Sequence, residues 1–125
     1  MNEKFPSFDL DPITKEQILD YADASGDHNK IHLDPDFARA AGLPNVIAHG
    51  MLSMGLAASA LEKWKISPNT LLKFESQFKE KVFPGETLRA EFISETELPT
   101  GHKLITWNLL KADGTEVLQA RAEIG

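Results

Sequence analysis

The chain has 125 residues, of which 42% are hydrophobic and 26% charged, and a formal net charge of −6 at pH 7. This length suits one domain with a continuous core, so we treat residues 1–125 as a single domain. No stretch approaches the roughly 20 apolar residues that span a bilayer, and the acidic balance argues against nucleic-acid binding, which uses an excess of lysine and arginine. Because cysteine is absent and the N-terminus lacks a signal-peptide pattern, we expect a cytoplasmic protein without disulfides.

Two short helices are predicted in the first third of the chain. Residues 14–24 begin with the capping-box pattern TKEQ, in which Thr14 and the glutamine three positions on bond to free amides. Gly26 is a suitable end for this helix. Residues 34–41 start with an Asp-Pro pair that favours a helix N-terminus, and Gly42 follows as a terminator.

A third helix is predicted from Gly50 to Trp64. Its sequence is apolar nearly all round, which indicates a helix buried on most of its faces. Several small residues, among them Gly55 and Ala57, allow a sheet to approach it closely. We therefore expect this to be the core helix.

The second half of the chain predicts antiparallel strands. Leu72, Phe74, Ser76 and Phe78 alternate with polar residues, which is typical of a half-buried strand. Turn residues then separate strands at 87–98, 102–112 and 115–124. Residues 5–12 allow at most a brief edge strand, because they contain two prolines. These elements predict an α+β fold in which an antiparallel sheet is wrapped around one long central helix.

Most of the polar chemistry lies between Ser25 and Met51, a segment that holds three of the four histidines. Asp27 and His32 are five positions apart, so they do not share a helix face. In a loop, their carboxylate and imidazole could both point at one water or substrate. The alternative is that Asp27 only caps the chain and His32 is a satisfied, partly buried histidine.

Two other kinds of site fit this segment less well. His28 and His32 have the i, i+4 spacing of a metal-binding pair, but this would need a helix where Gly26 and the Asp34 helix start favour a loop. We expect no bound metal. Nucleophilic catalysis lacks both a cysteine and a G-x-S-x-G turn.

Gly50 stands where the core helix is predicted to begin. Free backbone amides and the positive end of the helix dipole could stabilise an oxyanion or a polarised carbonyl there. Alternatively, the glycine only permits close packing. Periodicity does not separate these two interpretations.

Residues 21–32 read YADASGDHNKIH, residues 37–44 read FARAAGLP and residues 47–51 read IAHGM. Together they resemble the hydratase motif of the MaoC-like dehydratases, the (R)-specific enoyl-CoA hydratases. The match covers about a third of the chain closely, and the order of helix and strands fits the hot-dog fold of that family.

The resemblance implies functions for particular residues. Asp27 and His32 are similar to the family's catalytic pair, Asn29 to a polar residue that shapes the site, and Gly50 to the amide that faces the thioester carbonyl. The implied reaction is reversible addition of water to a trans-2-enoyl thioester of CoA or acyl-carrier protein, giving the (3R)-3-hydroxyacyl thioester without a cofactor. A thioesterase of the same fold and a non-catalytic acyl-thioester binding protein are the alternatives.

One departure from the family pattern is Lys30, which stands where the family normally has proline, so the ring that fixes the backbone is absent. The resemblance also implies a homodimer. An unpaired edge strand with apolar alternation invites pairing with another chain, and residues 71–83 could supply that edge.

Overall fold

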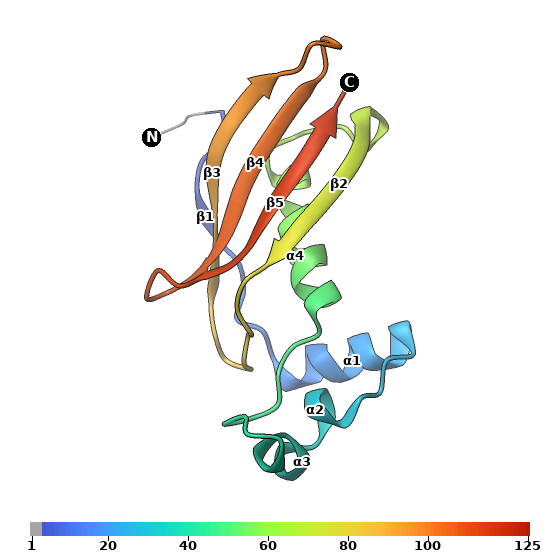
Figure 1. Cartoon of the computed structure of the whole chain (residues 1–125), viewed down its shortest axis with the longest axis vertical. Coiled ribbons are helices and arrows are strands. Elements are labelled where there is room, and N and C mark those ends of the chain that lie inside the picture. The colour runs from blue at the N-terminus through green and yellow to red at the C-terminus, as the bar shows by residue number, and fades with distance from the viewer. Residues whose placement is uncertain (1–3) are drawn as a thin grey trace.

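The structure, a computed structural model, describes residues 4–125 (Figure 1). Its helices are α1 (Lys15–Ser25), α2 (Lys30–Leu33), α3 (Pro35–Ala40) and α4 (Gly50–Lys63), with a 3-10 turn η1 (Pro68–Thr70). Its strands are β1 (Phe8–Asp9), β2 (Leu71–Phe78), β3 (Leu88–Glu97), β4 (Lys103–Lys111) and β5 (Glu116–Ile124). The predicted α+β composition is confirmed, and the segment with two prolines contributes only the two-residue strand β1.

The strands form one antiparallel sheet in the order β1-β3-β4-β5-β2. β2 precedes the other long strands in sequence, yet it lies at the far edge of the sheet and pairs only with β5 among the described residues. Residues 71–78 therefore provide an edge strand, as predicted.

The predicted core helix is confirmed: α4 packs against one face of the sheet and lies behind β5 and β2 in Figure 1. The indole Nε1–H of Trp107, on β4, donates a hydrogen bond to the Ala57 carbonyl of α4 at 3.0 Å. Burial of each large apolar side chain contributes roughly 1.5–3 kcal/mol. The fully buried side chains of the sheet that meet α4 or its surroundings are Leu88, Ala90, Ile105, Trp107, Leu109, Leu118, Ala120 and Ala122.

The expectation that α4 is buried on most of its faces is wrong for the single chain. Its buried residues are Ser53, Ala57, Ala60 and Leu61, which form one stripe toward the sheet. Met51 is 59% exposed, although it is apolar. The sheet covers only one side of the helix, so the apolar residues on the other side face solvent.

The predicted alternation along β2 is also wrong at its start. A β-bulge lies between Leu71 and Lys73, and an extra residue in a strand sends the next side chains to the opposite face. Leu71 and Phe74 consequently pack against the core, while Leu72 is 54% exposed.

The predicted N-cap residues Thr14 and Asp34 are confirmed. The Thr14 hydroxyl accepts a hydrogen bond from the Gln17 amide at 3.0 Å, and the Asp34 carboxylate accepts from the first amides of α3. Helices α1, α2 and α3 lie together beyond one end of the sheet, beside the start of α4 (Figure 1). Within residues 4–125, no helix has the length and apolarity of a membrane span.

Candidate active site

A hollow of about 330 Å³ opens at the N-terminal end of α4. It brings together three of the predicted site residues, Asp27, His32 and Gly50, which come from separate parts of the fold. Asn29, the fourth, is not among the lining residues. The full lining consists of Tyr21, Ser25, Asp27, His32, His49, Gly50, Met51 and Phe78.

Asp27 lies in the loop that follows α1. Gly26 ends that helix in the left-handed conformation with φ of 77°, which glycine adopts without strain. The Asp27 amide then donates to the Ser25 hydroxyl at 3.2 Å, and its own carboxylate accepts from the Asn29 amide at 3.2 Å. These local bonds fix the loop and leave the carboxylate exposed beside the hollow.

We predicted a loop at His32, but the residue lies on the one-turn helix α2. The helix forms because the Asn29 side chain accepts a hydrogen bond from the Ile31 amide at 3.1 Å and so caps it. Asn29 thus shapes the site through the backbone. His28 precedes α2, so the continuous helix that a His28 and His32 metal pair would need is absent.

The ring of His32 is 9% exposed, and its Nδ1 lies 2.7 Å from the Ile47 carbonyl oxygen. A carbonyl only accepts hydrogen bonds, so Nδ1 carries the proton. In the neutral ring, Nε2 is then the unprotonated nitrogen, and it is the one available to the hollow. One ring nitrogen of His32 is therefore hydrogen-bonded, as the alternative interpretation expected of both. The other, Nε2, remains free to take or give a proton.

Gly50 is the first residue of α4. The first amides of a helix have no partner within the helix and form the positive end of its dipole. A Cβ at Gly50 would lie 3.5 Å from the Phe78 ring, an ordinary contact. Packing alone therefore does not require glycine here, and the oxyanion role of Gly50 stays a prediction.

Sequence reasoning assigned no function to His49, which is the most buried polar residue of the hollow at 2% exposure. Its Nε2 lies 3.0 Å from the Asp27 carbonyl oxygen, and its ring stacks on that of His32 with centroids 3.8 Å apart. Its place in the IAHGM part of the motif and its position directly before a predicted helix start were the available signals. Tyr21, Met51 and Phe78 also line the hollow without having been predicted to do so.

A carboxylate oxygen of Asp27 and one ring nitrogen from each of His32 and His49 lie within 4.8 Å of one another. The planes of the two imidazoles differ by only 22°. Ring lone pairs lie in the ring planes, so those of two stacked imidazoles run side by side and do not converge on one ion. The geometry therefore favours acid–base chemistry over metal binding.

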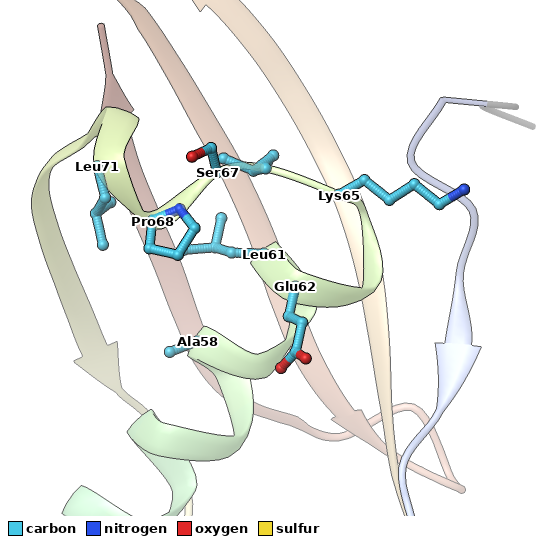
Figure 2. Close-up of a pocket in the computed structure, with 8 residues that line it drawn as sticks. Ala58, Leu61, Glu62, Lys65, Ser67, Pro68 and Leu71 are labelled. Atoms are coloured by element: carbon cyan, nitrogen blue, oxygen red, sulfur yellow. The ribbon is translucent and has the colours of Figure 1, made fainter.

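A second hollow, of about 580 Å³, lies at the other end of α4 (Figure 2). Its lining is mostly apolar, with Ala58 and Leu61 from the helix and Pro68 and Leu71 from η1 and the start of β2. Glu62, Lys65 and Ser67 stand at its margin. One side of α4 thus connects a polar hollow at its start with an apolar hollow near its end.

An antiparallel sheet packed against one long helix, with a carboxylate and two imidazoles beside the N-terminus of that helix, is the arrangement expected of a hot-dog domain of the hydratase type. The chain belongs to the MaoC like domain family, which it matches over residues 2–103. The predicted family and fold are therefore confirmed.

Among solved structures, the chain is similar to the (R)-hydratase from A. caviae involved in PHA biosynthesis. The TM-score is 0.82 and the identity 25%, over 98% of this chain and 96% of that one. It is also similar to an R-hydratase from Pseudomonas aeruginosa, with a TM-score of 0.76 and 26% identity over 95% of this chain and 77% of that one.

Among curated proteins, the chain is 44% identical over 69 residues to the peroxisomal enoyl-CoA hydratase 2 of Arabidopsis thaliana, covering 54% of this chain and 22% of that protein. It is 33% identical over 117 residues to the fatty acid synthase subunit beta of Saccharomyces cerevisiae, covering 92% of this chain and 6% of that subunit. The chain thus spans less than a quarter of each of these two relatives.

Proposed function

We propose that the protein is an (R)-specific enoyl-thioester hydratase that adds water reversibly to a trans-2-enoyl thioester. The observation that carries the proposal is the meeting of Asp27, His32 and Gly50 in one hollow. Hydration needs a base for the water, an acid for C2 and a stabiliser for the carbonyl oxygen. These three residues offer a group for each need. The names of the similar hydratases support the same reaction.

In the proposed reaction, a water molecule lies between the Asp27 carboxylate and Nε2 of His32. Asp27 takes a proton from the water while the oxygen of the water forms a bond to C3. The C2=C3 electron pair moves toward the thioester carbonyl. Asp27 then passes the proton to Nε2 of His32, and the imidazolium that forms delivers it to C2, which restores the carboxylate and the neutral ring of the starting state. The two groups share one proton, so their acid and base labels can exchange.

The thioester carbonyl gains negative charge when the water attacks. We place its oxygen at the N-terminus of α4, where the Gly50 amide can donate a hydrogen bond and the helix dipole favours negative charge. Neither this step nor the proton transfers require a metal or an organic cofactor.

We further propose that the acyl chain extends from Gly50 along the exposed side of α4. Between Gly50 and Ala58 the helix rises about 12 Å. That path leads from the polar hollow to the apolar one shown in Figure 2. The carrier, CoA or acyl-carrier protein, then remains on the solvent side of Asp27.

The substrate path has an open side in the single chain, and we propose that a second copy of the chain covers it. Leu72 and Phe78 of the edge strand β2 are about half exposed, as is Met51 at the start of α4. Exposed apolar side chains beside an unpaired strand edge favour association. Light scattering should give a mass of about twice the 13.8 kDa of one chain, and a mass near 13.8 kDa would disprove the dimer.

Product analysis tests the proposed reaction. With a short trans-2-enoyl-CoA we expect loss of the ultraviolet absorbance of the conjugated double bond and formation of the (3R) product. Free thiol in place of the hydroxyacyl thioester would indicate a thioesterase, and binding without either change a non-catalytic protein. Substrates of increasing length test the path along α4, because turnover should persist well beyond the shortest chain.

A further inference from the structure

His49 is a buried titratable residue that the proposed reaction does not use. It is 2% exposed, and its Nδ1 is buried without a hydrogen-bond partner among the described residues. An unsatisfied buried polar atom costs roughly 1–3 kcal/mol. An apolar residue would avoid that cost, so the imidazole needs another explanation.

The hydrogen bond to Asp27 fixes the tautomer of His49. Nε2 lies 3.0 Å from the Asp27 main-chain carbonyl oxygen, which can only accept, so Nε2 carries the proton. The buried Nδ1 is then the unprotonated nitrogen of a neutral ring, which is the cheaper state because a charged N–H without a partner would be more costly to bury. His32 has the opposite tautomer, with the proton on Nδ1.

The same residue contacts each part of the site. Its ring donates to the Asp27 carbonyl and stacks on His32 with centroids 3.8 Å apart and planes 22° apart. The Tyr21 ring also packs against it, with ring centroids 4.9 Å apart. Its carbonyl accepts the first hydrogen bonds of α4, from Leu52 and Ser53, and the next residue is Gly50.

We infer that His49 is a positioning residue. Its Nε2–H bond to the Asp27 carbonyl holds the Asp27 loop at a fixed position relative to His32 and the start of α4. The Asp27 loop otherwise depends on local bonds to Ser25 and Asn29, which orient the loop internally but do not tie it to α4. The inference rests on the proposed hydration, in which a small displacement of a catalytic group lowers the rate by up to about 100-fold.

Two substitutions separate the hydrogen bond from the ring. His49→Phe keeps an aromatic ring against His32 but has no donor. His49→Gln loses the ring, yet its amide nitrogen lies the same number of bonds from Cα as Nε2. We expect His49→Phe to lower kcat by about tenfold or more with little change in KM, and His49→Gln to stay within about threefold of wild type. His28→Gln, at an exposed histidine outside the hollow, is the matched control and should keep full activity.

A value of kcat for a folded His49→Phe within about threefold of wild type would overturn the inference, as would equal losses in the Phe and Gln variants. Nitrogen NMR of the histidine rings tests the contact itself in the wild-type protein, whether or not a variant folds. It should find His49 protonated on Nε2 and His32 on Nδ1, and a proton on Nδ1 of His49 would refute the bond. Because this spectrum needs no substrate, it remains decisive if the wild type fails to hydrate any enoyl thioester.

Discussion

The Nδ1 atom of His32 lies 2.7 Å from the carbonyl oxygen of Ile47, and the Ile47 amide in turn donates to the Ile31 carbonyl at 3.1 Å. This double contact joins α2 to the connection that leads into α4. It orients the imidazole, fixes which nitrogen is protonated and leaves Nε2 for the hollow. The main chain of Ile47, a residue without a reactive side chain, thus sets which nitrogen of His32 can exchange a proton in the hollow.

Replacement of His32 tests the acid–base pair. His32→Ala removes the nitrogen that faces the hollow, and general acid–base catalysis contributes typically 10²–10⁴-fold, so we expect kcat to fall by a factor in that range. His102→Ala is the matched control, because that ring pairs with Glu123 elsewhere on the sheet. The assignment fails if both variants keep their activity while circular dichroism shows native folding.

Gly50→Ala should separate activity from stability. Alanine favours a helix over glycine by up to about 1 kcal/mol, and its methyl group would meet the Phe78 ring only at an ordinary contact distance. The melting temperature should therefore stay level or rise. Turnover should fall, because the methyl group narrows the space in front of the Gly50 amide. Unchanged kcat and KM would remove Gly50 from the proposed oxyanion site.

Lys30→Pro should be tolerated. Lys30 is the first residue of α2, where proline is favoured because the amide has no helical partner. Asn29 before it has φ of −56° and ψ of 130°, an extended conformation that a following proline accepts. Thermal unfolding should show equal stability or a gain of about 0.4–1 kcal/mol. A clear loss would mean that the Lys30 side chain, which lies 6.0 Å from the Phe37 ring, makes a contact that the fold needs.

The exposed His28 should titrate above its ordinary pKa of 6.5, chiefly because its ring bonds to the Asp23 carboxylate at 3.0 Å. A raised pKa means that the folded state binds the proton more tightly than the unfolded chain. The stability that results is fully present below pH 6.5 and is lost as pH rises through the folded-state pKa. Asp23→Asn should lower this pKa in an NMR titration, and an unchanged value would show that the bond is not formed in solution.

Much of the fold could be predicted because local signals were strong. Turn residues such as Gly101 and Gly114 separate strands whose alternation was clear, and those strands are present as β3, β4 and β5. The bulge at the start of β2 could not be predicted, because Leu71 and Leu72 are both apolar and the pattern does not say which one faces the core. An apolar pattern also does not say what covers it, so α4 appeared more buried than it is.

The candidate site was predictable only in part, because a local sequence pattern does not show which distant residues come into contact. Asp27, His32 and Gly50, which line one hollow, could be proposed because their residue types and motif indicate chemistry. The contact between His49 and Asp27 joins residues 22 positions apart. It depends on the path of the connection between α3 and α4, which has no helical or strand periodicity. Only the three-dimensional arrangement places that ring against both Asp27 and His32.

The most direct measurement of the central claim is hydration of a trans-2-enoyl-CoA by wild-type protein and by Asp27→Asn, followed by loss of the conjugated absorbance. Asparagine keeps the shape of the side chain but cannot accept a proton from water at neutral pH, so we predict (3R)-hydroxyacyl-CoA from the wild type and nearly none from the variant. Asp23→Asn, at an exposed carboxylate outside the hollow, should remain active. Turnover by a natively folded Asp27→Asn within about threefold of wild type, a difference below roughly 1 kcal/mol, would contradict the account.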